Sequence, residues 1–384
     1  MRVLALDPYH GGSYRAFLEG LIAHSRHEWA VLSLSDRFPE WRLQGGAVTL
    51  ARKAQGLEGP FDVVFATDML NLPLWLALIR DRWGSLPVAL YMRKNPLTVP
   101  LEPGQERKLE LAYIVYSSVL VADAVWFNSQ YHLREFIAAL PELLGRFPDS
   151  NHLGELPEIA RKSRVVYPGM VLRRHDAFPD LRHRNDAPVI LWNQRWGYDK
   201  NPEAFWRIIN RLFEAGLKFR LILSGQHFEH RPEGFEIVWR RYGDRILHYG
   251  YVEDFAEYSR LLHRADVVLS TARHEFFGTA IWEAVYCGAH PVLPNRLTYP
   301  EILPERLHRP LLHAPALYES EEEAFEILRA LLRGEERPLP KATLQEALGG
   351  FDWSERAQEF DRLLESLATQ RVIVSYGFGD VESL

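Results

Sequence analysis

The sequence predicts an α/β protein built from two doubly wound domains, each with a parallel sheet between helices. Short apolar runs alternate with helix-length amphipathic segments in both halves of the chain, and this alternation is typical of βαβ units. The chain has 384 residues, more than a single hydrophobic core commonly holds. Residues 173–187 are charged, contain proline and show no apolar periodicity, so they predict a linker between the domains.

Residues 1–172 are expected to form the N-terminal, acceptor-side domain. Apolar runs predict six strands, at residues 3–6, 29–34, 61–67, 87–91, 124–128 and 164–167. Ser13 stands where the N-cap of a helix ending at His24 is expected, and a second helix, 129–140, follows Asn128. Strand, polar turn and helix therefore form the repeated unit.

Residues 188–350 are expected to form a second, nucleotide-sugar-binding domain, and residues 351–384 a C-terminal helix and tail. The predicted strands of the second domain are 188–192, 219–223, 246–249, 267–269 and 291–293, with a helix at 202–215. Asp352 would start a final helix over 353–367. Ligands of open α/β sheets bind beyond the carboxyl ends of the strands, so functional residues should lie in post-strand loops.

Composition excludes several classes of protein. Hydrophobic residues make up 47% of the chain and charged residues 25%, which is globular rather than disordered composition. The single Cys287 permits no internal disulfide, so a reducing cytoplasm is expected. Asp7 and Pro8 come too early for a signal peptide, and no apolar run is long enough to span a membrane. A net charge of -6 argues against indiscriminate nucleic-acid binding, although a local basic patch stays possible.

The most informative segment, 271–284, follows a predicted strand and opens a helix at Gly278 or Thr279. The backbone N–H groups of such a helix start form an anion site. Glu275 precedes the helix, and Glu283 lies about 6 Å along its axis from Thr279. Carboxylates accept hydrogen bonds from vicinal hydroxyls, so one could bind a sugar and the other a ribose. The alternative, that both are solvated or interact only with the helix dipole, fits this context less well.

A second post-strand segment, 192–202, carries two cations in front of a helix that Asn201 can cap and Pro202 can begin. Arg195 and Lys200 could stabilise the charge that develops on a leaving diphosphate. Metal-dependent enzymes of this kind often carry a D-x-D pair, which this sequence lacks, so no metal is expected. The alternative is that Arg195 and Lys200 are ordinary surface cations.

Two weaker signals remain. Gly11 and Gly12 follow the first strand, where the backbone could approach a phosphate or simply turn. His10 beside them could contact an acceptor or carry a proton, or be an ordinary surface residue.

Basic residues gather around the expected linker and could bind a polyanionic acceptor or be merely solvated. They are Arg161, Lys162, Arg164, Arg173, Arg174, Arg182 and Arg184.

The spacing of Glu275 and Glu283 resembles the Glu-x₇-Glu signature of the family-4 retaining glycosyltransferases. Their GT-B architecture places two Rossmann-like domains around a central cleft. The resemblance implies a metal-independent hexosyltransferase in which Arg195, Lys200 and Glu275 act in catalysis. The residues expected to bind the donor are then Gly11, Gly12, Arg195, Lys200, Glu275, Phe276, Phe277, Gly278, Thr279 and Glu283.

A narrower resemblance, from about residue 2 to 365, is to the tRNA-queuosine α-mannosyltransferase family. It is carried by the segments 9–13, 67–72, 127–129, 195–196, 199–202 and 274–278. It implies a GDP-mannose donor with no separate cofactor, queuosine in a tRNA anticodon as acceptor, and retained anomeric configuration. The acceptor-binding residues would be His10, Asp68, Arg93 and Asn95.

The sequence departs from this family at two places. Met92–Leu97 reads Met-Arg-Lys-Asn-Pro-Leu where the family usually has Phe-His-Glu-Asn-Gln-Leu, and Asn193–Tyr198 replaces a Pro-His-Arg-Trp-Glu-His run. Three hypotheses therefore stand: a hexosyltransferase acting on queuosine in tRNA, a related transferase with a small glycan, lipid or metabolite acceptor, and a degenerate module that binds nucleotide sugar or tRNA.

Overall fold

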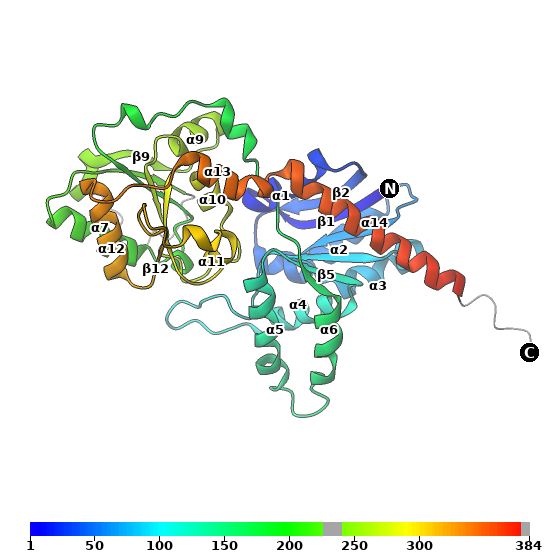
Figure 1. Ribbon diagram of the computed structural model, residues 1–384. Helices are drawn as coiled ribbons and strands as arrows, with labels where there is room; N and C mark the ends of the chain where they lie inside the picture. Colours follow the sequence, from blue (N-terminus) through cyan, green and yellow to red (C-terminus); the bar gives the residue numbers. More distant parts are fainter. Residues whose placement is uncertain (226–239, 378–384) are drawn as a thin grey trace, which may run out of the picture. The chain divides into compact units, whose positions relative to one another are not determined.

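The computed structural model describes residues 1–225 and 240–377, with side chains as far as residue 369 (Figure 1). The chain divides into two compact units. Unit 1 comprises Met1–Gly169 and the segment from Trp353 onward, and unit 2 comprises Met170–Asp352. Each unit contains a six-stranded sheet in which every strand pair is parallel, which confirms the predicted fold class.

The sheet of unit 1 has the strand order β2-β1-β3-β4-β5-β6. Its strands are β1 (Arg2–His10), β2 (Glu28–Ser35), β3 (Val63–Thr67), β4 (Val88–Met92), β5 (Ala124–Phe127) and β6 (Ser163–Val165). Strand order reverses between β1 and β3, which are directly paired from Val3 with Val63 to Leu6 with Ala66. The loops that follow β1 and β3 therefore open at the position where doubly wound sheets bind ligands.

The helices of unit 1 are α1 (Gly12–His24), α2 (Pro39–Ala54), α3 (Leu72–Trp83), α4 (Leu109–Val121), α5 (Gln130–Leu144), α6 (Leu156–Lys162) and α14 (Trp353–Gly377). The expectation that Ser13 caps the first helix is wrong, because the extended residue before the helix is Gly11. A β-carbon at Gly11 would lie 2.0 Å from the Asp36 carboxyl carbon, so a larger residue there would displace the Asp36 side chain. Ser129 caps α5 by accepting a hydrogen bond from the His132 amide.

Helix α14 belongs to unit 1, although the sequence suggested a separate C-terminal segment. The indole of Trp353, its first residue, is 1% exposed and fills the space beside two glycines. A β-carbon on Gly20 or Gly169 would lie 2.1 or 2.2 Å from that indole. Phe360 on the same helix contacts the ring of Phe17. The last helix therefore completes the core of the first unit, and the chain enters and leaves unit 2 between Gly169 and Trp353.

The sheet of unit 2 has the order β12-β11-β10-β7-β8-β9. Its strands are β7 (Val189–Asn193), β8 (Arg220–Ser224), β9 (Ile246–Gly250), β10 (Val267–Leu269), β11 (His290–Pro294) and β12 (Leu317–Tyr318). Counted along the chain this is the 3-2-1-4-5-6 order of dinucleotide-binding Rossmann domains, with the reversal between β7 and β10. Strand β12 was not predicted, because two residues give too short an apolar run.

The helices of unit 2 are α7 (Pro202–Glu214), α9 (Phe255–Leu262), α10 (Thr279–Tyr286), α11 (Tyr299–Ile302), α12 (Glu321–Arg333) and α13 (Lys341–Leu348). Residues 173–187, expected to be a linker, pack within this unit as short 3₁₀ turns. His175 is fully buried and its Nδ1 lies 2.9 Å from Ser259 Oγ. His175 thus ties the segment to α9 of the same unit. Among the described residues, no helix is both long and apolar enough to cross a membrane.

Candidate active site

Two loops of unit 2 meet where its strand order reverses. One follows β7 and the other follows β10, the two strands that flank the reversal. The amides of Arg273 and His274 donate to the Asp199 carbonyl at 2.9 and 3.1 Å. The Thr271 hydroxyl donates to the carbonyls of Lys200 and Asn201 at 3.1 and 2.9 Å. These hydrogen bonds join the two loops and fix the positions of the side chains that the loops carry.

Lys200 lies at the centre of the contacts between these two loops. Its side chain is only 8% exposed, and Nζ lies 2.8 Å from Glu275 Oε2 and 3.3 Å from Asp199 Oδ2. Nζ also donates to the His274 carbonyl at 2.9 Å. The predicted pair Lys200 and Glu275, 75 residues apart, is therefore in direct contact. A buried ammonium between two carboxylates stays fixed in one position.

Glu275 also binds the start of the following turn. Its Oε1 accepts hydrogen bonds from the amides of Phe276 and Phe277 at 3.1 and 3.4 Å. Burial alone raises the pKa of Glu275, but the charge and hydrogen bond of Lys200 outweigh it, so that pKa lies below its usual range. Two amides that the sequence analysis assigned to an anion of the donor thus hold the anion of Glu275 itself. Gly278 follows with φ of 86°, a conformation that favours glycine.

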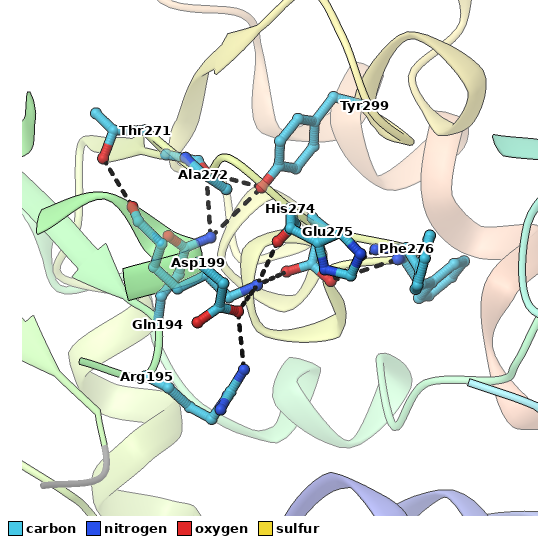
Figure 2. Close-up of polar contacts among 12 residues, drawn as sticks. Gln194, Arg195, Asp199, Thr271, Ala272, His274, Glu275, Phe276 and Tyr299 are labelled. Atoms are coloured by element: carbon cyan, nitrogen blue, oxygen red, sulfur yellow. Dashed lines mark hydrogen bonds and ion pairs between the residues drawn. The ribbon is translucent and has the colours of Figure 1, made fainter. Parts of the chain in front are cut away.

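Arg195 extends from the same cluster toward solvent. Its guanidinium lies 2.9 Å from Asp199 Oδ2, and its side chain is 46% exposed (Figure 2). Burial would raise the pKa of Asp199, but Lys200 and Arg195 hold it below its usual range. Asp199 therefore bridges the two cations and keeps the guanidinium near Lys200. The sequence analysis did not assign Asp199 a role, although it lies four residues after Arg195 and next to Lys200.

Glu283 contacts a different set of residues. The Tyr258 hydroxyl donates to Glu283 Oε2 at 2.8 Å and accepts from Asn193 Nδ2 at 2.9 Å. Asn193 is the last residue of β7, and its Nδ2 also donates to the Ala280 carbonyl at 2.8 Å. Burial raises the pKa of Glu283 to about 7, and the Tyr258 hydrogen bond offsets part of that rise. Tyr258, on α9, was not identified because it belongs to no sequence motif.

We expect Tyr258→Phe to weaken donor binding and to change its pH dependence. Loss of this hydrogen bond raises the pKa of Glu283 further, so the carboxylate expected to accept ribose hydroxyls forms only at higher pH. In the wild type, donor affinity should improve as the pH rises through about 7. In the variant, this improvement should come about one to two pH units higher, because a hydrogen bond to a charged group contributes about 1.5–3 kcal/mol. Donor KM measured across pH tests this.

The matched control for that experiment is Tyr286→Phe. Tyr286, on α10, also donates its hydroxyl to a carboxylate, that of Asp176, at 2.9 Å. Its hydroxyl binds Asp176 rather than Glu283 or Asn193, so its removal should leave the pH profile unchanged. An identical profile for wild type and Tyr258→Phe would show that Tyr258 does not control the protonation of Glu283.

Residues expected to contact the acceptor gather at the carboxyl edge of unit 1. His10 Nδ1 lies 2.7 Å from Oδ2 of the fully buried Asp7, whose Oδ1 accepts from the Thr67 hydroxyl at 2.8 Å. Oδ2 of Asp68, just after β3, accepts from the Arg93 amide at 3.0 Å. Asp7 was not predicted to take part, because it lies inside β1 rather than in a loop.

Arg93 lies between two buried carboxylates. Nη2 is 3.8 Å from Asp7 Oδ1, Nε is 3.8 Å from Asp68 Oδ1, and the guanidinium carbon is 3.5 Å from the ring centre of Tyr14. Burial raises the pKa of Asp68, and Arg93 offsets part of the rise. Nε and Nη2 of Arg93, Oδ1 of Asp68 and the Tyr14 hydroxyl are buried without hydrogen-bond partners. Such a set of donors and an acceptor suits a ligand rich in hydroxyls.

Asn95 has a local structural role in addition. It is fully buried, and its Oδ1 accepts from the Leu97 amide at 3.0 Å, which turns the chain after β4. Its Nδ2 is buried without a partner. Asn95 therefore combines a turn with one unused donor, as expected of a residue beside a ligand site.

The expected donor-binding residues do not all lie in one unit. Gly11 and Gly12 belong to unit 1, whereas the other eight belong to unit 2. The side chains of Phe276 and Phe277 are buried at 4% and 3% exposure, and both amides bind Glu275, so the two residues support the site mainly by holding that carboxylate. Thr279 is the first residue of α10, where the amides have no acceptor within the helix.

The basic residues near the expected linker belong to both units, so their grouping into one patch stays a prediction. Three of the seven are engaged locally. Arg161 pairs with Glu158 at 2.6 Å, Lys162 Nζ donates to two backbone carbonyls, and Arg182 pairs with Asp180. These three side chains are thus engaged within their own units. In the described part of the chain, no group of three or more His, Cys, Asp or Glu side chains is placed to hold a metal ion.

Solved structures share the fold of this chain. Sucrose-phosphate synthase from Thermosynechococcus elongatus has a TM-score of 0.69 at 14% identity, covering 96% of this chain and 100% of that one. Anabaena HepE, solved in complex with UDP and glucose, has a TM-score of 0.65 at 17% identity, covering 95% and 100%. Two Rossmann-like units of this kind are the fold of the GT-B glycosyltransferases.

Sequence comparison gives the family. Residues 2–170 match the family described as tRNA-queuosine alpha-mannosyltransferase N-terminal, and residues 173–337 match Glycosyl transferases group 1. The tRNA-queuosine alpha-mannosyltransferase of Drosophila melanogaster is 30% identical over 313 residues, which cover 79% of this chain and 82% of that protein. The chain therefore belongs to the tRNA-queuosine alpha-mannosyltransferase family, and it is a glycosyltransferase.

Proposed function

We propose that the protein transfers mannose from GDP-mannose to queuosine in tRNA, with retention of the anomeric configuration. The observation that carries this proposal is the cluster of Arg195, Asp199, Lys200 and Glu275 at the strand reversal of unit 2. The name of the Drosophila relative supports queuosine and mannose as acceptor and sugar. No cofactor besides the donor is needed for this reaction.

The donor half of the reaction follows from the charges in unit 2. When the glycosidic bond breaks, negative charge builds on the β-phosphate of the leaving nucleotide, and preorganised cations lower the free energy of that transition state. Lys200 is fixed by Glu275 and Asp199, and Arg195 reaches out from Asp199 toward solvent. The Glu275 carboxylate is ionised and can accept a hydrogen bond from a sugar hydroxyl. Glu283, bound by Tyr258, can accept from the ribose once it is ionised.

The acceptor half would be served by unit 1. The cyclopentenediol of queuosine presents two neighbouring hydroxyls, each both a donor and an acceptor. Asp68 Oδ1 can accept from such a hydroxyl, and Arg93 Nε and Nη2 can donate to one. His10, bonded to Asp7, is the last residue of β1 and would serve as the proton carrier beside the acceptor. We expect the reaction to take place in the cytoplasm, where tRNA is available.

Mass spectrometry of tRNA nucleosides tests the proposal. Queuosine-containing tRNA is incubated with the protein and GDP-mannose, digested, and compared with tRNA that lacks queuosine. The expected result is a hexose adduct on queuosine in the first sample and none in the second. Queuosine that never gains a hexose, while the donor is consumed with another acceptor, would contradict it.

A second candidate function keeps the donor site but changes the acceptor. The observation that favours it is the Arg93–Lys94–Asn95 run, in which a guanidinium is held between Asp7 and Asp68. This environment differs from the His-Glu pair that the sequence resemblance leads one to expect. Transfer to a small glycan, lipid or metabolite in the absence of tRNA would select this candidate. Donor cleavage that is lost in Lys200→Ala would dismiss a third reading, a binding module without activity.

A further inference from the structure

Two large aromatic side chains are exposed near the start of α2 in unit 1. Phe38 is 70% exposed and Trp41 is 61% exposed. Within the described residues, neither ring pairs with another aromatic ring or lies under a cation. Single exposed apolar residues are ordinary, but a Phe and a Trp three positions apart, both mostly in solvent, form an apolar surface with flat faces.

The backbone at Phe38 has an unusual conformation, and a neighbouring glycine lies against the ring of Trp41. Phe38 has φ of 56°, which is uncommon for an aromatic residue, and Pro39 begins the helix directly after it. The Trp41 indole lies against Gly45, one turn along α2, where an added β-carbon would be 2.8 Å from the indole carbon Cζ2. Because Gly45 has no side chain, the indole can pack directly against the helix backbone at this position. An indole supported in this way loses little conformational entropy when a ligand stacks on it.

The position of this pair places it beside the acceptor residues of the same unit. Strand β2 ends at Ser35, which is paired with His10 of β1. Asp36 fills the space next to Gly11 that a β-carbon would occupy. Glu40 pairs with Lys108 at 2.6 Å, which ties the start of α2 to the segment that follows β4 and Arg93. The aromatic pair thus lies at the same carboxyl edge as His10 and Arg93.

Cations accompany the two rings. Arg37 is exposed, and Arg42 is held at the edge by donating from Nε to the Ser35 carbonyl at 3.0 Å and from Nη2 to the Ser35 hydroxyl at 3.1 Å. Of the acids in this stretch, Glu40 is neutralised by Lys108 and Asp36 lies against Gly11. Flat aromatic faces flanked by arginines are the combination with which proteins bind single-stranded RNA, stacking on bases and contacting phosphates.

We propose that Phe38 and Trp41 form a stacking surface for unpaired bases of the acceptor RNA loop, with Arg37 and Arg42 contacting the adjacent phosphates. The inference rests on the proposed function in taking RNA as the acceptor. It goes beyond it by assigning the part of the protein that holds the nucleotides next to the modified one. A base in an anticodon loop reaches an enzyme pocket only when its neighbours are held out of their own stack.

Fluorescence anisotropy with a labelled anticodon stem-loop, in the absence of donor, measures this binding directly. Trp41→Leu and Phe38→Leu keep apolar side chains but remove the ring faces, and each should weaken binding roughly 5- to 150-fold, the range for loss of one base–aromatic stack. Trp41→Tyr keeps a ring and should retain most of the affinity. Gly45→Ala, which displaces the indole without changing charge, should also weaken binding. Arg37→Gln should reduce the salt dependence by about one phosphate contact.

The control is Val121→Ala, which removes part of another exposed apolar side chain of unit 1. Val121 ends α4, directly before β5, and therefore lies at the opposite, amino edge of the sheet. It should bind the stem-loop like the wild type. If Trp41→Leu and Phe38→Leu also bind like the wild type, or if they change only the oligomeric state in analytical ultracentrifugation, the inference is overturned.

The transfer assay separates this inference from the proposed function. Hexose transfer to queuosine by the wild type, with unchanged tRNA KM in Trp41→Leu, overturns the stacking surface and leaves the proposed function intact. A wild type that transfers no hexose to tRNA, but whose stem-loop binding falls in Trp41→Leu, overturns the proposed function and supports the surface. A raised tRNA KM in Trp41→Leu, with donor affinity unchanged, supports both.

Discussion

Lys200→Met is expected to lower kcat/KM for glycosyl transfer by roughly three or more orders of magnitude, the loss expected when a preorganised transition-state cation and its neighbours are disturbed together. The variant removes the only positive charge within 4.0 Å of Glu275 among the ion pairs of the described residues. Burial then dominates, so the pKa of Glu275 rises and the carboxylate tends to become neutral. The site therefore loses a cation for the phosphate and an acceptor for the sugar at once.

The same variant should change stability with a defined pH dependence. In the wild type the lowered pKa of Glu275 contributes stability at neutral pH that is lost as pH falls through that pKa. In Lys200→Met the raised pKa reverses the sign, so the variant becomes relatively more stable as pH falls. Breaking a buried pair costs about 3–5 kcal/mol at neutral pH. Thermal unfolding at several pH values measures this.

A matched control separates lost catalysis from lost stability. Lys162 is a half-buried lysine of unit 1 whose Nζ donates to the carbonyls of Leu120 and Ala122. Lys162→Met should destabilise the protein while leaving turnover per folded molecule unchanged. If Lys200→Met lost no more turnover than Lys162→Met, the role given to Lys200 in the reaction would be refuted.

Arg195→Ala is expected to lower turnover by roughly two to four orders of magnitude, as loss of a single electrostatic contact to the transition state can do. Unlike Lys200, Arg195 is half-exposed, and its pair with Asp199 should add little to stability, about 0–1 kcal/mol. The expected result is therefore a large loss of kcat with an almost unchanged melting temperature. Steady-state kinetics and calorimetry on the same preparation measure both.

Arg207→Ala is the control for that experiment. Arg207, on α7 of the same unit, pairs with Glu321 on α12 and has a comparable exposure of 56%. Its removal should affect neither turnover nor donor binding. A change in turnover of less than threefold in Arg195→Ala would mean that the guanidinium does not contact the diphosphate.

The two glutamates of the Glu-x₇-Glu motif have the same side chain, but their surroundings shift their pKa values in opposite directions. Glu275, beside Lys200, has a pKa below its usual range, whereas Glu283, beside the neutral Tyr258, has a pKa of about 7. Titratable groups whose pKa values are driven apart commonly have different roles in one site. Glu275 is a permanent anion at neutral pH, and the charge of Glu283 depends on pH in the physiological range.

Much of the fold could be predicted from local sequence patterns. Buried parallel strands appear as continuous apolar runs, so 11 of the 12 strands in the described residues lie within a few residues of their expected positions, including β7 and β10, which bear the site. The short β12 gave no such signal. The place of α14 in unit 1 could not be predicted, because the Trp353 indole fits against Gly20 and Gly169, far away in the sequence.

Site residues could be predicted where a motif directly follows a strand. They were missed where their role depends on contacts between separate helices and strands. Lys200 and Glu275 each lie in a post-strand loop, and the reversal of strand order brings those loops together. Tyr258 and Asp7 lie inside a helix and a strand, and only the folded chain shows that they hold Glu283 and His10. The binding of the Phe276 amide to Glu275 likewise depends on side-chain geometry that spacing does not reveal.

Calorimetric titration of nucleotides tests most directly the claim that unit 2 holds a diphosphate through Arg195 and Lys200. Guanosine and uridine diphosphates are each compared with their monophosphates on the wild type, Arg195→Ala and Lys200→Met. We predict that the wild type prefers the diphosphate of its cognate base and that both variants lose most of this preference. Variants that keep the full wild-type preference would place the phosphates elsewhere and contradict the account.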